Sequence, residues 1–99
     1  MVFRLNNLNY NIINLAREIG YRPLKYTSEG QLNCVRSLGA DYPRFHIYLK
    51  EDKDVVTFNI HLDQKKPSYE GTSAHAGEYE SDAVKEEVVR IKDMIFRKH

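Results

Sequence analysis

The chain has 99 residues, of which 41% are hydrophobic and 29% charged, and its 15 basic residues are nearly balanced by 14 acidic ones. This composition predicts one folded domain and excludes a disordered chain or a strongly basic one, so any basic surface must be local. Cys34 is the only cysteine, which excludes an internal disulfide and a cysteine-based zinc site. Without an apolar run near 18 residues or a signal peptide, we expect a cytoplasmic protein with no membrane contact.

We expect a first helix over about residues 6–19, where apolar side chains recur on one helical face. Asn6 or Asn7 is expected to cap its start, and Gly20 suits the turn that ends it. The apolar residues recur at spacings of four, three and four, and they are Leu8, Ile12, Leu15 and Ile19.

A strand of imperfect alternation is expected over residues 31–38, and a β-hairpin is expected over residues 45–62, with a charged turn at residues 51–54. Side chains alternate between the two faces of a strand. The apolar hairpin residues must share the buried face, and they are Phe45, Ile47, Leu49, Val56, Phe58, Ile60 and Leu62. His46 and His61 are therefore expected together on the opposite face, within about 4.5–8 Å of each other.

Residues 64–80 show no regular periodicity and form a long connection. Loops beyond about 12–15 residues are uncommon in compact domains unless they are functional or disordered, and disordered tracts are poor in aromatic residues. This segment contains Tyr69, His75 and Tyr79. We therefore expect an ordered loop that crosses the polar side of the hairpin and brings His75 within reach of His46 or His61.

A second helix is expected from about residue 82 onward, with Ser81 as its N-cap and an i,i+4 pair of Glu86 and Arg90. Its apolar stripe consists of Val84, Val88, Ile91 and Ile95. The expected fold is a single α+β domain over residues 1–99, with a three-stranded antiparallel sheet backed by two helices in the order α-β-β-β-α. The sheet face that carries the histidines would then face solvent or a partner.

The candidates for catalysis are His46, His61 and, if the long loop folds back, His75. Histidine titrates near neutral pH, so one ring can accept a proton while another donates one. In RNA cleavage, such a pair would activate a 2′-hydroxyl group and protonate the leaving oxygen. The alternative is that these histidines are ordinary surface residues.

Basic and aromatic residues in and after the hairpin indicate RNA as a partner. Basic side chains interleaved with aromatic rings suit single-stranded or distorted RNA. The candidate binding residues are Arg44, Tyr48, Asn59, Lys65, Lys66 and Tyr69. The alternative is solvated surface charge, because acidic residues are interspersed among them.

Two other functions remain open, and neither a metal nor a cofactor is part of the leading hypothesis. The first is a metal-dependent hydrolase, in which donors suited to zinc or another divalent ion come from His61, His75, Asp63 and Glu78. The second is a non-catalytic interaction module, for example a homodimer formed through the exposed sheet face or an edge strand, with a protein partner that the sequence does not identify.

The hairpin also resembles a known family. Residues 45–48 (FHIY), the charged turn and residues 55–61 (VVTFNIH) resemble the paired strands of the HicA-type toxin ribonucleases, and residues 19–21 resemble the end of that family's first helix. The resemblance covers about half of the chain and implies a double-stranded-RNA-binding-like α-β-β-β-α fold, with His46 and His61 matching family histidines. Phe45 stands where that family has its principal catalytic histidine, so the resemblance implies the fold more directly than the activity.

Overall fold

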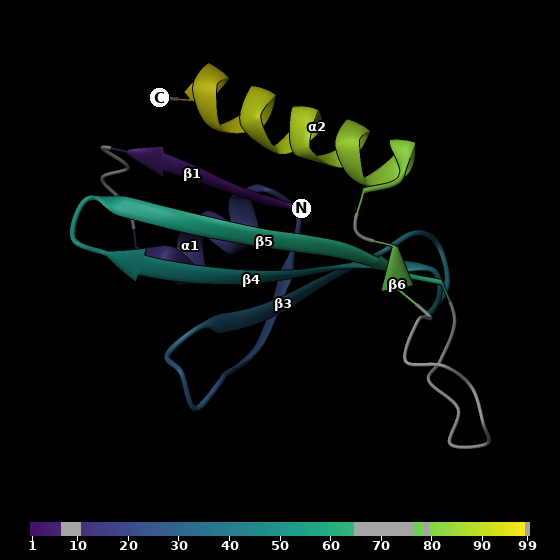
Figure 1. The fold of residues 1–99 in the computed structure, drawn as a ribbon, viewed down its shortest axis with the longest axis horizontal. Coiled ribbons are helices and arrows are strands. Elements are labelled where there is room, and N and C mark those ends of the chain that lie inside the picture. Colours follow the sequence, from purple (N-terminus) through teal and green to yellow (C-terminus); the bar gives the residue numbers. More distant parts are fainter. Residues whose placement is uncertain (7–10, 65–76, 79, 99) are drawn as a thin grey trace.

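The computed structural model describes residues 1–6, 11–64, 77, 78 and 80–98. In chain order, the elements are β1 (Val2–Asn6), α1 (Ile12–Glu18), β2 (Arg22–Tyr26), β3 (Leu32–Ser37), β4 (Arg44–Asp52), β5 (Val55–Asp63), β6 (Gly77–Glu78) and α2 (Asp82–Lys98), as labelled in Figure 1. Neither of the two helices in these ranges combines the length and apolar character needed to cross a membrane.

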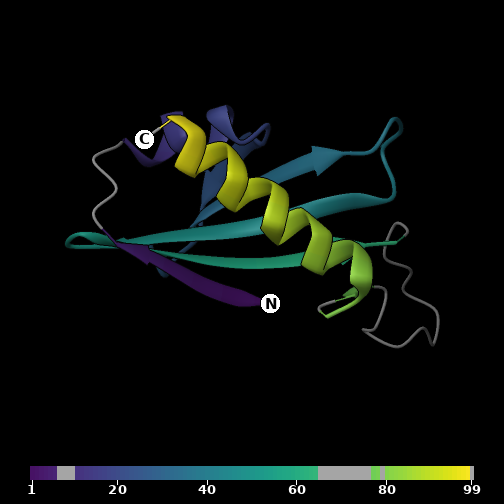
Figure 2. The same ribbon diagram turned by 90° about the horizontal axis from the view of Figure 1, so that it is seen from above.

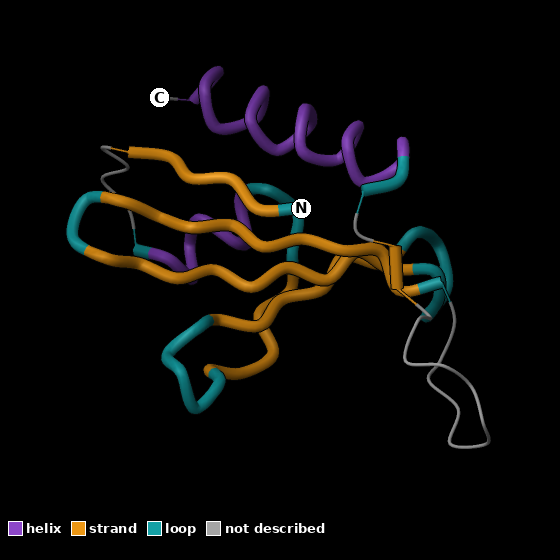
Figure 3. The backbone as a smooth tube through the Cα atoms, viewed as in Figure 1, coloured by secondary structure: helices purple, strands orange, loops and turns teal. Residues whose placement is uncertain are grey.

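The described strands form one antiparallel sheet, in which five strands follow the order β1-β5-β4-β3-β2. The short strand β6 pairs with the end of β5, on the edge that β1 leaves unpaired (Figure 3). The expected three-stranded sheet and the order α-β-β-β-α are therefore wrong, although helices backing one face of an antiparallel sheet remain an α+β arrangement.

The missed strand β1 precedes the expected first helix and overlaps it only at Asn6. Phe3 and Leu5 alternate with Arg4 and Asn6, which is the period of a strand, and the ring of Phe3 stacks on that of Phe58 at 4.5 Å between centroids. The pattern spans only five residues, so tertiary pairing with β5 decides its conformation.

The missed strand β2 contains Pro23 and lies at the other edge of the sheet. Proline has no backbone N–H group and is tolerated in a sheet at an edge strand. The pairing of β2 with β3 shifts register between Pro23 and Lys25. This irregularity obscures the alternation that would identify a strand.

Helix α1 begins at Ile12 instead of near residue 6. The side-chain oxygen of Asn11 accepts hydrogen bonds from the backbone N–H groups of Ile13 and Asn14, at 2.9 and 3.3 Å, so Asn11 is the cap. Asn6 lies in β1, while residues 7 and 8, including the expected core residue Leu8, are outside the described ranges. The expected end of the helix is confirmed, because Gly20 has φ +90 and follows the last turn.

Both described helices pack on the same face of the sheet, as Figure 2 shows from above. This core face is lined by the expected apolar positions, and the buried ones are Leu15, Ile19, Phe45, Ile47, Leu49, Val56, Phe58, Ile60, Leu62, Val84, Val88, Ile91 and Ile95. Ile12 is only partly buried against this core. The expected antiparallel hairpin with one shared apolar face is confirmed, but its turn covers residues 53–54 rather than 51–54, because β4 continues to Asp52 and β5 begins at Val55.

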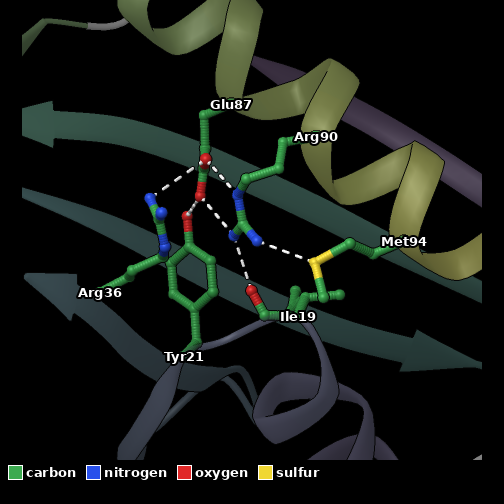
Figure 4. A network of polar contacts seen from close by, with 6 residues as sticks. All are labelled: Ile19, Tyr21, Arg36, Glu87, Arg90 and Met94. Carbon is green, nitrogen blue, oxygen red and sulfur yellow. Dashed lines mark hydrogen bonds and ion pairs between the residues drawn. The ribbon is translucent and has the colours of Figure 1, made fainter.

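A buried polar network ties α2 to the sheet and to the end of α1 (Figure 4). The carboxylate of Glu87 accepts hydrogen bonds from the Tyr21 hydroxyl at 2.6 Å and from Arg90 Nε and Nη2 at 2.6 and 2.8 Å. Arg36 Nη1 donates to the same carboxylate at 3.3 Å, and Arg90 Nη2 also donates to the carbonyl of Ile19 at 2.6 Å. Arg90 therefore pairs with Glu87 instead of with Glu86, its expected partner.

Candidate functional site on the polar face of the sheet

The polar face is the sheet face opposite the two helices. His46 and His61 lie directly opposite each other on β4 and β5, as the alternation predicts, and their ring centroids are 4.9 Å apart. Asp63 follows His61 by two residues and therefore shares this face. Its Oδ2 atom lies 3.2 Å from His46 Nδ1, and its Oδ1 atom lies 2.9 Å from His61 Nε2. One carboxylate thus bridges both imidazoles.

Two further side chains from neighbouring positions hold the His46 ring. The ring of Tyr48 stacks on it with centroids 4.9 Å apart. Asn33, which lies on β3 opposite Tyr48, places its Oδ1 atom in contact with His46 Nε2. Tyr48 also lies 6.2 Å from the His61 ring, so three aromatic rings gather at the centre of the face.

The two imidazoles are largely shielded, with only 13% of the His46 side chain and 12% of the His61 side chain exposed. Burial lowers the pKa of both rings below the ordinary histidine value. The neighbouring charge of His61 lowers the pKa of His46 further, while Asp63 acts in the opposite direction on both. Neutral rings are therefore favoured near pH 7, and a neutral ring carries one N–H donor and one acceptor nitrogen.

Arg44 lies opposite Asp63 in the register of β4 and β5. Its Nε atom is 3.6 Å from Asp63 Oδ2, which is ion-pair range but too long for a hydrogen bond. This buried nitrogen makes no hydrogen bond within the described part of the chain. The Arg44 guanidinium also lies over the ring of Tyr42, at 4.7 Å from its centroid.

Positive charge concentrates on the polar face even though the whole chain is nearly neutral. Cross-strand partners share a sheet face. Thr57 of β5 pairs with Lys50 on one neighbouring strand and with Arg4 on the other. Arg22 of β2 pairs with Val35 of β3. The register shift in β2 brings Lys25 opposite Asn33 and so onto the same face as Arg22. Among the described strand positions of this face, the cations are Arg4, Arg22, Lys25, Arg44 and Lys50, and the carboxylates are Asp52 and Asp63.

The structure brings together part of the expected site. His46, His61, Arg44, Tyr48 and its cross-strand partner Asn59 share the polar face. The other expected residues, His75, Lys65, Lys66 and Tyr69, lie outside the described residues, as does the expected crossing of the loop. Glu78 lies in β6 opposite Leu62 rather than opposite His61.

Sequence reasoning missed the contributions of Asn33 and of the basic residues on β1 and β2. It considered Asp63 only as a metal ligand, although its spacing of two from His61 already placed it on the histidine face. No sequence pattern placed Arg4, Arg22 and Lys25 on this face, because the strands that contain them were not predicted.

No protein-family model, curated protein or solved structure matches this chain.

Proposed function

We propose that the protein binds RNA, with single-stranded RNA as the preferred form, through the polar face of the sheet. The observation that carries the proposal is the coincidence, on one face, of five cations with the Tyr48 ring, which is packed against the largely shielded imidazoles of His46 and His61. Cationic grooves that track phosphates, combined with rings on which bases stack, are the means by which proteins hold single-stranded nucleic acids.

The rings supply the part of this interaction that is independent of charge. Tyr48 is partly exposed, and its ring is held in place by stacking on His46, so little side-chain freedom is lost when a base stacks on it. Stacking of a base on an aromatic ring contributes about 1–3 kcal/mol and tolerates any base. This arrangement favours binding with little sequence preference.

The cations supply the part of the interaction that depends on salt. They extend from Arg4 on one edge strand to Arg22 and Lys25 on the other, so a backbone that crosses the strands would meet several of them. Each neutralised phosphate releases condensed counterions, so RNA affinity would fall steeply as salt rises.

Cleavage of the bound RNA is the finer form of the proposal. His46 and His61 are both oriented by Asp63, and one ring would accept the proton of a 2′-hydroxyl group while the other protonates the leaving oxygen. Cleavage would require both rings, whereas binding requires mainly Tyr48 and the cations.

The test is fluorescence anisotropy with a labelled single-stranded RNA, from about 25 to about 250 mM salt. We expect Tyr48→Ala to weaken binding about tenfold and Arg44→Gln to reduce the salt slope by about one. The matched controls are Tyr26→Ala and Arg97→Gln, because Tyr26 lies opposite the core residue Leu32 and Arg97 lies on α2. Absence of binding at low salt, or equal losses in the controls, would overturn the proposal.

The same RNA is then followed on a denaturing gel with wild-type protein, His46→Gln and His61→Gln. Cleavage that both substitutions abolish, with anisotropy little changed, would support the ribonuclease form. Binding without cleavage by the wild-type protein would leave a binding domain only.

A further inference from the structure

Three side chains of the polar face direct donor atoms toward one another. One candidate ligand atom each from His46, His61 and Asp63 lies within 4.8 Å of the other two. Two imidazole nitrogens and a carboxylate oxygen are a common donor set for divalent transition metals. We propose that these three residues bind one divalent transition-metal ion, with zinc as the probe. This inference goes beyond RNA binding and does not depend on it.

The surroundings of His46 supply a second observation. Oxygen atoms face both of its ring nitrogens, since Nδ1 lies 3.2 Å from Asp63 Oδ2 and Nε2 contacts Asn33 Oδ1. An imidazole with a single N–H group can donate to only one of these oxygens. If Nε2–H donates to Asn33, the lone pair of Nδ1 faces a carboxylate oxygen, and this arrangement requires a cation or a second proton between the two atoms.

A metal ion between Nδ1 and the carboxylate would give His46 the usual environment of a metal-binding histidine. Such a histidine binds the metal through one nitrogen and donates its other N–H to an oxygen that fixes the ring. Asn33 occupies that position. The competing arrangement has the Asn33 amide turned over, so that its NH₂ group donates to Nε2 and the protein closes the network without an ion.

The three donor atoms lie within 4.8 Å of one another, so the most distant pair would approach by up to about 1.5 Å to reach the spacing of a metal site. His61 Nε2 lies 2.9 Å from Asp63 Oδ1, and ligand atoms of a tetrahedral zinc site are about 3.3 Å apart. His46 and His61 are direct cross-strand partners and Asp63 is two residues further along β5. Because the hairpin register fixes all three positions, the site is built on rigid elements.

The positive charge of Arg44 disfavours a bound metal ion, so removing this charge should increase the affinity for metal. Its Nε atom lies 3.6 Å from Asp63 Oδ2, where its charge competes with a dication for the same carboxylate. Removing this charge by Arg44→Gln should strengthen metal binding by about threefold. The same substitution should weaken binding of RNA, so the two proposals predict opposite changes for one variant.

The experiment uses the full chain, stripped with a chelator and titrated with zinc alone in competition with a chromophoric chelator. We expect one equivalent to bind, with at least tenfold weaker binding, about 1.4 kcal/mol, in His61→Gln and in Asp63→Asn. Cobalt substitution should give the visible absorption of a site with nitrogen and oxygen ligands. Circular dichroism checks that each variant remains folded, and Thr57→Ala on the same face is the matched control with unchanged affinity.

Three results would overturn the metal site. These are the absence of a stoichiometric ion, undiminished affinity in both ligand variants, and loss of affinity in His75→Gln or His99→Gln while His61→Gln retains it. Zinc binding without RNA binding would support the metal site and refute the proposed function. RNA binding without zinc binding would support the proposed function and refute the metal site.

Discussion

Glu87 and Asp63 are both carboxylates shielded by the fold, yet the two faces of the sheet surround them differently. On the core face, Glu87 is only 4% exposed and accepts hydrogen bonds from Tyr21, Arg36 and Arg90. On the polar face, 20% of the Asp63 side chain is exposed, and it is shared between His46, His61 and an Arg44 nitrogen that makes no hydrogen bond within the described residues.

This difference separates a structural network from the proposed binding site. The Glu87 network has its donors and acceptors matched, and hydrogen bonding to Glu87 raises the pKa of Arg90, so the network gains nothing from a ligand. In the Asp63 cluster, Arg44 Nε makes no hydrogen bond within the described residues, and both ring nitrogens of His46 face oxygen atoms. A buried polar group that is incompletely satisfied needs an explanation, and a bound phosphate or metal ion would supply one.

The largest expected effect is the loss of stability in Glu87→Gln. Removing one charge from a buried ion pair leaves its partners uncompensated, which costs about 3–5 kcal/mol when they are fully buried. Because the Arg36 and Arg90 side chains are each 29% exposed, we expect a loss of about 2–3 kcal/mol in the free energy of unfolding. Urea denaturation measures it.

Asp63→Asn is the control for this comparison, and we expect it to lower the free energy of unfolding by only about 1 kcal/mol, because its ring partners are neutral near pH 7 and leave no uncompensated charge. Losses of equal size in Asp63→Asn and Glu87→Gln would contradict the division between a structural face and a binding face.

Tyr21→Phe should have the next largest effect on stability. It removes a hydroxyl that donates to the buried carboxylate at 2.6 Å, and hydrogen bonds to charged groups contribute about 1.5–3 kcal/mol. Tyr26→Phe is the matched control, because Tyr26 is 53% exposed and should change stability by less than about 0.5 kcal/mol. Equal changes in the two variants, measured by urea denaturation, would show that the Tyr21 hydroxyl is not part of a stabilising network.

A smaller effect is expected from pH in metal-free protein. Burial lowers the pKa of His46 and His61, and the positive charge of Arg44 lowers it further. The negative charge of Asp63 raises the pKa of both rings but does not cancel these effects. The unfolded chain therefore takes up protons at higher pH than the folded protein, so this contribution to stability is complete above about pH 6.5 and is lost as pH falls through the folded pKa values.

Urea midpoints measured between about pH 7.5 and about pH 5.5 with a chelator present should therefore fall as pH falls. His61→Gln should make the dependence shallower. A midpoint that rises on acidification, or an unchanged slope in the variant, would contradict the shielding of these rings.

The smallest expected signal is the reaction of Cys34 in the native protein. This thiol is fully buried on the core face, and burial raises its pKa to about 12, so the reactive thiolate is scarce near pH 8. We expect no detectable labelling by a thiol reagent in native buffer and complete labelling in denaturant. Fast native labelling would mean that the core face opens readily.

The sequence predicted the features that depend on strong local periodicity. Alternation in the hairpin fixed which residues are buried and placed His46 opposite His61, and the stripe from Val84 to Ile95 identified α2. Edge strands are short and only partly buried, so the alternation in β1 spans only five residues and that in β2 is incomplete. Their pairing with β5 and β3 is a tertiary effect.

The contacts that define the two polar clusters also lay beyond sequence reasoning. Tyr21 and Glu87 are separated by 66 positions, and Asn33 reaches His46 from a neighbouring strand. Such contacts depend on how elements pack, and a pattern within one element does not encode them. The histidine pair was accessible only because both residues belong to one hairpin.

The measurement that tests the central claim most directly is an NMR titration of the protein with single-stranded RNA at low salt. We expect the imidazole resonances of His46 and His61 and the amides of β4 and β5 to shift in a saturable manner. The amides around Val89, on the exposed side of α2, should stay in place. Shifts confined to α2, or no shifts at either face, would contradict the assignment of the polar face as the binding surface.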